Sequence, residues 1–194
     1  LARWMHPVEG ELAPTSFLGT VDECGLGAAL FSGMLREAAR FLRVVDREQI
    51  ALAGSLRVWV NFDPNTARRI GESVERLVQS IGVDPRRLGV EVTETSVMHD
   101  VDGAKAVLEQ LRSIGVQSAL DDFGTGHSSL SLLQMLPVDK VKIDRSFVRD
   151  VAEDQRDLTL VRAIAGLAAD LGLDVVAEGV ETEEQREILA ELGC

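Results

Sequence analysis

Residues 101–122 read VDGAKAVLEQLRSIGVQSALDD, and this stretch decides the fold class. Gly115 is typical of the position after a helix end, and Val116–Leu120 is a short, largely apolar run typical of a buried strand. Two aspartates, Asp121 and Asp122, follow directly. Apolar side chains before Gly115 recur at the spacing of one helix face: Val101, Ala104, Val107, Leu108, Leu111 and Ile114. The stretch therefore predicts a helix and then a strand with a polar end.

The same alternation recurs along the whole chain. A second helical pattern covers 158–171, Asp63 before Pro64 suits a helix start, and Thr182 with Gln185 predicts a capping box. Strands that alternate with helices predict an α/β fold of parallel βαβ units, either a doubly wound sheet or a TIM barrel. A GxGxxG fingerprint after the first strand is missing, so we favour a TIM-type (β/α) barrel. The predicted strands are Leu56–Val60, Leu88–Val92, Val116–Leu120, Val138–Ile143 and Leu173–Ala177.

Composition limits the classes of function. The 194 residues suit one domain or a large part of one, and the formal net charge of −12 argues against binding polymeric nucleic acid. Cys24 and Cys194 lie far apart without CxxC spacing, which favours a reducing, cytoplasmic location. No apolar run approaches the ~18 residues of a membrane span. Because the chain starts at Leu1 without a Met, we expect it to be part of a longer protein.

Polar side chains lie at the end of each predicted strand or directly after it. In a TIM barrel the carboxyl ends of the strands converge on one mouth, where the active site lies. Crowded carboxylates repel one another unless cations are bound, and oxygen ligands favour Mg²⁺ or Mn²⁺. Two such ions with a nearby amine are suited to the attack of water on a phosphodiester. The side chains in question are Asn61, Glu91, Glu94, Asp121, Asp122, Lys142, Asp144 and Glu178.

Several of these residues also have a purely structural interpretation. A single acidic residue after a strand is usually a helix cap, and Asp144 can simply brace its strand end. Glu181 can help to begin the helix near Thr182, and Trp4 and Trp59 are expected in the core. Five polar strand ends in register are harder to explain by capping alone.

The motifs resemble the EAL domain family. The loop Asp121-Asp122-Phe123-Gly124-Thr125-Gly126-His127-Ser128-Ser129-Leu130 is similar to the family's DDFGTGYSSL, with His127 in place of Tyr. Residues 60–64 resemble VNLSP, although Asp63 replaces Ser. Residues 91–94 look like ExTE, residues 142–144 match KID, and residues 177–181 match AEGVE. Leu1-Ala2-Arg3-Trp4 with His6-Pro7 matches the sequence after the naming Glu-Ala. The resemblance extends from Leu1 to Cys194.

The resemblance implies an activity and a set of roles. In this family two metal ions support hydrolysis of cyclic di-GMP to linear pGpG. Lys142 is the implied catalytic residue, which positions or deprotonates the attacking water, and Arg3 and Asp144 are implied to contact the substrate. Glu94, Thr125 and Ser128 are implied to support the loop after Asp122. The implied metal ligands are Asn61, Glu91 and Asp121 for the first ion, and Asp121, Asp122 and Glu178 for the second.

The resemblance also sets expectations about the rest of the protein. The Glu of the naming motif, implied to be a further ligand of the first ion, falls before Leu1, and a Gln and Gly-Tyr segment implied to help hold guanine falls beyond Cys194. We therefore expect residues 1–194 to be most of an EAL domain, with the barrel truncated at both ends. We also expect residues 1–194 alone to bind cyclic di-GMP weakly and to hydrolyse it poorly. A homodimer and an upstream sensory or GGDEF domain are implied, and the parent protein can be membrane-anchored. Two alternatives stay open: a cyclic di-GMP receptor without hydrolysis, and an EAL-fold interaction module.

Overall fold

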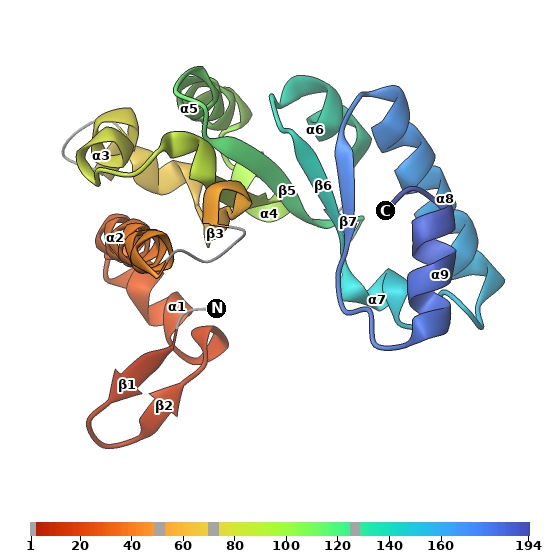
Figure 1. Ribbon diagram of the computed structural model, residues 1–194, viewed down its shortest axis with the longest axis horizontal. Helices are drawn as coiled ribbons and strands as arrows, with labels where there is room; N and C mark the ends of the chain where they lie inside the picture. Colours follow the sequence, from red (N-terminus) through yellow and green to blue (C-terminus); the bar gives the residue numbers. More distant parts are fainter. Residues whose placement is uncertain (1–2, 49–52, 70–73, 125–128) are drawn as a thin grey trace.

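The computed structural model describes residues 3–48, 53–69, 74–124 and 129–194 (Figure 1). The strands are β1 (Trp4–His6), β2 (Gly10–Leu12), β3 (Val58–Asn61), β4 (Leu88–Thr93), β5 (Gln117–Phe123), β6 (Lys140–Ile143) and β7 (Asp174–Ala177). The α-helices are α1 (Pro14–Glu23), α2 (Gly27–Arg47), α3 (Val74–Ser80), α4 (Glu94–Met98), α5 (Val101–Ser113), α6 (Ser129–Met135), α7 (Arg145–Val148), α8 (Gln155–Asp170) and α9 (Glu183–Glu191). Short 3₁₀ helices cover Ala53–Ser55, Pro64–Arg69 and Pro85–Arg87.

Strands β3 to β7 form one parallel sheet in the order of the chain. In a doubly wound fold the strand order reverses at a switch point, and right-handed crossovers then place helices on both faces. An unbroken order instead keeps every crossover helix on the same side, which is the arrangement in a (β/α) barrel. The predicted α/β fold of TIM-barrel type is confirmed.

The register of the sheet brings the polar strand ends to one edge. Asn61 lies opposite Glu91, and Thr93 lies opposite Asp121. In the last strand pair, β6 and β7, Ile143 lies opposite Ala177, the residue before Glu178. The predicted strand ends therefore meet at the carboxyl edge rather than scattering over different faces.

Two strands differ from the predicted ranges at informative places. β6 begins at Lys140 rather than Val138. Asp139 still joins the neighbouring segments, since its amide donates to the Ser118 carbonyl and its carboxylate accepts from the Ser118 amide, both at 2.9 Å. β5 continues through both aspartates to Phe123. Other local predictions are confirmed: Thr182 and Gln185 form a reciprocal capping box, and Asp63 accepts from the Asn65 amide at the start of a 3₁₀ helix.

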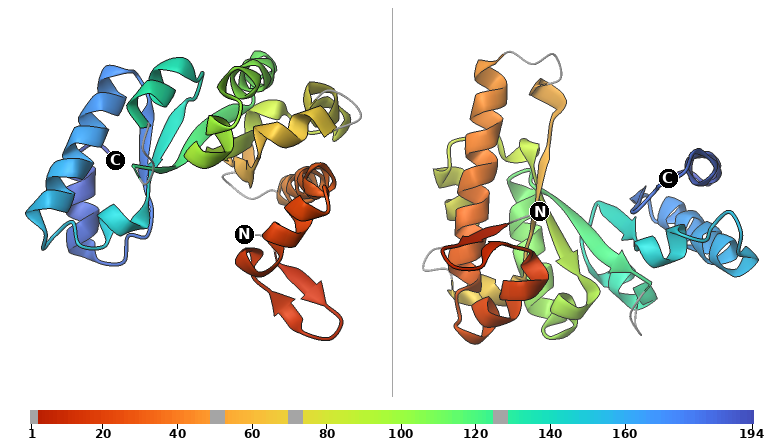
Figure 2. Two further views of the ribbon diagram at one scale, coloured as in Figure 1. Left: turned by 180° about the vertical axis from the view of Figure 1, so that it is seen from behind. Right: turned by 90° about the horizontal axis from the view of Figure 1, so that it is seen from below.

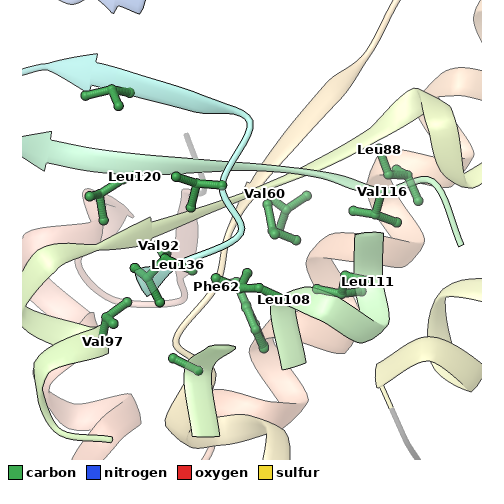
Figure 3. Packing of buried hydrophobic residues seen from close by; sticks show 14 of the residues in the cluster. Val60, Phe62, Leu88, Val92, Val97, Leu108, Leu111, Val116, Leu120 and Leu136 are labelled. Atoms are coloured by element: carbon green, nitrogen blue, oxygen red, sulfur yellow. The ribbon is translucent and has the colours of Figure 1, made fainter. Parts of the chain in front are cut away.

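The hydrophobic core lies between the sheet and the helices on its outer face. Val60, Val92 and Leu120 of the strands belong to one cluster with Leu108 and Leu111 of α5 and Val97 of α4 (Figure 3). Because strand side chains alternate between faces, the residues between these valines and leucines point to the inner face. That inner face is largely polar, since it includes Glu91, Asp121 and Lys142.

The N-terminal hairpin β1–β2 lies apart from the parallel sheet (Figure 2). Trp4 was expected in the core, but it is 46% exposed and packs edge-on against His6 and Phe17. The prediction was wrong because a two-stranded ribbon has no second layer to cover both of its faces. No helix among the described residues is long and apolar enough to cross a membrane.

Trp59 is partly buried on the inner face, where its indole lies over Gly89 of the neighbouring strand. A Cβ atom at Gly89 would stand 2.4 Å from Cε3 and 2.5 Å from Cδ2 of the Trp59 ring. The backbone of Gly89 needs no special φ, so the close approach of a rigid ring is what requires a glycine here.

We predict that Gly89→Ala lowers the free energy of unfolding by about 1–3 kcal/mol, as expected for overpacking against a rigid ring. Gly166→Ala is the matched control, because a Cβ on this exposed position of α8 meets nothing within 4 Å. The control should raise stability by about 0.5–1 kcal/mol. Urea denaturation of both variants measures the difference, and equal stabilities would show that Trp59 does not cover Gly89.

Candidate active site

Lys142 occupies the centre of the site. Its Nζ atom lies 3.1 Å from Glu91 Oε1, 2.9 Å from Asp121 Oδ1 and 2.5 Å from Glu178 Oε1. These partners come from β4, β5 and the end of β7, so one amine from β6 joins four adjacent strands. The side chain of Lys142 is only 12% exposed. Buried charges need partners of opposite sign, and the three carboxylates supply them.

A bulge in β5 brings two consecutive aspartates to the same side. In a regular strand Asp121 and Asp122 would point to opposite faces. The β5–β6 register shifts between Leu120 and Phe123, and Asp122 has a φ of +55°. Among the described residues other than glycine, Asp122 is alone in adopting a positive φ. Such left-handed backbone costs energy and tends to occur at functional sites.

The bulge creates a cluster with the geometry of a cation site. Asp121, Asp122 and Glu178 each offer a carboxylate oxygen, and these oxygens lie within 4.8 Å of one another. All the donors are oxygens, as Mg²⁺ and Mn²⁺ prefer. Asp121 belongs to this cluster and also contacts Lys142 beside Glu91, so it connects the two halves of the site.

The electrostatics of the site indicate an excess of negative charge. Burial raises the pKa of Glu91, and the charges of Asp121 and Glu178 raise it further. Partial desolvation and the charge of Asp121 likewise raise the pKa of Asp122. Burial is the larger cause for both groups and the neighbouring carboxylates add to it, so ionisation of Glu91 and Asp122 is disfavoured. Divalent cations fit this donor set and would relieve the repulsion.

The same carboxylates favour the charged form of the Lys142 amine. Burial disfavours the charged form of Lys142, but the hydrogen bonds that its Nζ donates to Glu178, Asp121 and Glu91 outweigh this and raise its pKa above the ordinary value. With these partners Lys142 is an ammonium group that donates hydrogen bonds.

Glu94 supports the loop that follows the two aspartates. The residue is 4% exposed, and its Oε1 atom accepts a hydrogen bond from the Gly124 amide at 2.8 Å. The other two residues predicted to support the loop, Thr125 and Ser128, lie outside the described residues, as does His127.

The remaining predicted site residues lie around or away from this cluster. Asn61 is opposite Glu91 in the register, at the same edge of the sheet. Asp144 caps α7, where its Oδ1 accepts from the Ser146 amide at 3.0 Å. Arg3 precedes the separate hairpin, and its Nε lies 3.2 Å from Glu11 Oε1. The structure thus does not bring Arg3 beside the carboxylates, and the substrate roles of Arg3 and Asp144 stay predictions.

Sequence reasoning missed two contributors to the site. It identified Asp122 as a candidate ligand but did not predict the bulge that turns its side chain. No local residue pattern in the sequence indicates that bulge. Sequence reasoning also assigned Gln185 only to a helix cap. This buried side chain accepts from the amides of Glu181 and Thr182 and donates to the Arg149 carbonyl, so it ties the segment after Glu178 to α7.

Comparison with known proteins identifies relatives of this chain. A relative from Pseudomonas aeruginosa, "Cyclic di-GMP phosphodiesterase NbdA", is 41% identical over 100% of this chain and 25% of its own length. Another from the same organism, "Bifunctional diguanylate cyclase/cyclic di-GMP phosphodiesterase MucR", is 40% identical over 100% of this chain and 28% of its own. The chain thus spans about a quarter of the length of these curated relatives.

Solved structures show the same fold with ligands bound. "PaMucR Phosphodiesterase, c-di-GMP complex" is 39% identical with a TM-score of 0.86, over 99% of this chain and 77% of that one. A manganese and cyclic di-GMP complex of Klebsiella pneumoniae BlrP1 is 35% identical with a TM-score of 0.65, over 80% of this chain and 42% of that one. A family model described as "EAL domain" matches residues 1–194. The chain belongs to the EAL domain family.

Proposed function

We propose that this domain hydrolyses cyclic di-GMP to linear pGpG with the help of two divalent cations, Mg²⁺ or Mn²⁺. The observation that carries the proposal is the position of Asp121, which joins the carboxylates around Lys142 to the cluster with Asp122 and Glu178. Two relatives named as cyclic di-GMP phosphodiesterases support the choice of substrate.

The residues divide into two overlapping sets of ligands. Asn61, Glu91 and Asp121 would hold one ion, and Asp121, Asp122 and Glu178 the other. Bound ions supply Lewis acidity and a water molecule of lowered pKa for in-line attack on the phosphodiester. The shared carboxylate of Asp121 would keep the two sets at a constant separation.

Lys142 would position the attacking water by donating a hydrogen bond. Its present partners, Glu91, Asp121 and Glu178, hold its proton firmly. When cations offset the charge of these carboxylates, the interactions that raise the Lys142 pKa weaken. Once its own proton has been released to solvent, the neutral amine can accept a proton from the attacking water.

Binding of the substrate would involve groups beyond the carboxylates. The guanidinium of Arg3 has the forked donors that suit a phosphate, although it contacts Glu11 here. Use of Arg3 would require the hairpin segment to approach the sheet edge. We further propose that the domain acts together with other domains, since the relatives are several times longer. We also propose a cytoplasmic location.

We predict that Asp121→Asn lowers the rate of hydrolysis by about 100-fold or more, because loss of the shared charge misplaces both ions and the water. Asp174→Asn is the control: it lies on the same sheet at the opposite strand end and pairs with Lys140. The measurement is pGpG release in Mn²⁺ at saturating cyclic di-GMP. Undiminished hydrolysis in Asp121→Asn, or in excess chelator, contradicts the proposal.

The same assay separates an enzyme from a receptor. If the intact domain, including the segments that the resemblance places before Leu1 and beyond Cys194, binds cyclic di-GMP by calorimetry but releases no pGpG with Mn²⁺, the domain is a non-hydrolytic receptor. If it neither binds nor hydrolyses the dinucleotide, an interaction module is the better description.

Affinity for Mn²⁺ should fall as the pH is lowered from about 7.5 to about 5.5, because protons compete with metal for the same oxygens. The raised pKa values of Glu91 and Asp122 mean that these carboxyls take up protons at higher pH than ordinary carboxyls do. Titration with Mn²⁺ at both pH values tests this. Equal affinities would show that these two carboxyls are not ligands.

We also propose a homodimer formed by the loop after Asp122 and the helix that follows it. Met135 at the end of α6 is 45% exposed, which leaves apolar surface on that helix for a partner. Light scattering should give about twice the 21.1 kDa of one chain. A constant monomer mass at high concentration would refute the dimer.

A further inference from the structure

The left-handed backbone of Asp122 is held from several directions. Its amide lies 3.1 Å from Asp121 Oδ1, and the next residue, Phe123, is 2% exposed in the core. Beyond Phe123, the amide of Gly124 is bound by Glu94. Strained backbone persists only where its surroundings over-determine it, so each contact on this segment affects where the Asp122 carboxylate points.

Phe147 supplies a contact that the proposed catalytic residues do not explain. A Cβ atom at Gly124 would lie 3.0 Å from Cε2 and 3.4 Å from Cζ of the Phe147 ring, and 3.7 Å from Cδ1 of Ile164. Gly124 has a φ of +98°. Position 124 therefore requires glycine for two reasons: its backbone has a positive φ, and the Phe147 ring packs directly against it.

The helix that carries Phe147 is itself firmly placed. At its start, Asp144 accepts from the Ser146 amide, and in its last turn Val148 is fully buried. Beyond its end, the Arg149 carbonyl accepts from Gln185 Nε2 at 2.8 Å. A phenylalanine ring has only two side-chain torsions, so on this short helix it forms a rigid surface for the loop.

Helix α7 also touches the segment that carries the other ligand of the cluster. Gly179 follows Glu178 directly and has a φ of +71°. A Cβ atom there would lie 2.7 Å from Cβ of Arg145. The same helix therefore packs against the residues that follow both Asp122 and Glu178.

We propose that Phe147 is a positioning residue for the metal site: its ring packs against Gly124 and, together with Glu94, holds Asp122 in the left-handed conformation that aims its carboxylate at Asp121 and Glu178. The inference rests on the proposed function, because it assigns Phe147 to the cation held by these three carboxylates. Phe147 does not touch the cation; it acts through the backbone of residues 122–124.

The test compares Mn²⁺ binding by four forms of the 194-residue chain: wild type, Phe147→Ala, Phe147→Leu and Leu158→Ala. Removing a group that orients a ligand typically costs 10- to 100-fold in metal affinity. Phe147→Ala should lose about that factor at one of two Mn²⁺ sites and keep the other, whereas Phe147→Leu should restore most of the affinity. Leu158 is the control because it is also partly buried against the core, but on α8.

The outcomes separate the positioning role from general destabilisation. Leu158→Ala should lower the melting temperature but leave both Mn²⁺ affinities unchanged. Unchanged Mn²⁺ binding in Phe147→Ala, or equal loss in Leu158→Ala, overturns the positioning role alone. If the wild-type chain binds no Mn²⁺ at all, the proposed function fails and the inference fails with it.

A second measurement needs no metal and covers the case in which Phe147→Ala folds poorly. In the metal-free protein, amide hydrogen exchange at Gly124 reports the hydrogen bond to Glu94. Phe147→Val, which removes most of the ring contact but is a milder change than Phe147→Ala, should speed exchange at Gly124 relative to the core amide of Val92, whereas Phe147→Leu and Leu158→Ala should not. Equal protection of Gly124 in wild type and Phe147→Val refutes the proposal.

Discussion

Crowding of carboxylates at one edge of a parallel sheet is the constraint on which the rest of this domain depends. Glu91, Asp121 and Glu178 surround the ammonium of Lys142, and Asp122 adds a further negative charge beside them. One amine cannot neutralise four carboxyls, and burial together with the charges of their neighbours raises the pKa values of Glu91 and Asp122. The arrangement is unfavourable for folding alone, but it prepares the site for divalent cations.

The surrounding fold resists the repulsion by dividing the two faces of the sheet. Buried valines and leucines on the outer face pack against the helices, so the strands cannot rotate to release the charged inner face. Because β3 to β7 all run parallel, every carboxyl end lies at the same edge. Hydrophobic packing on one side thus determines electrostatic crowding on the other.

Beyond the strand ends, short segments turn individual side chains into place. Glu94 and Phe147 hold Gly124 from different elements, and Gln185 joins α7 to the segment after Glu178. These contacts come from α4, α7 and α9, far apart in the sequence. A change in any of these helices can therefore reach the metal ligands without touching them.

The sequence by itself determined the fold class and most of the candidate site, because both depend on local patterns. Helix-spaced apolar residues before Gly115, the capping pair Thr182 and Gln185, and polar residues after each strand are readable without coordinates. Only the tertiary structure decided that Asp121 and Asp122 share one side, because a bulge depends on the partner strand β6 and not on the residues within it. It likewise decided that Trp4 is exposed and that Phe147 meets Gly124, since burial and packing are set by elements distant in the chain.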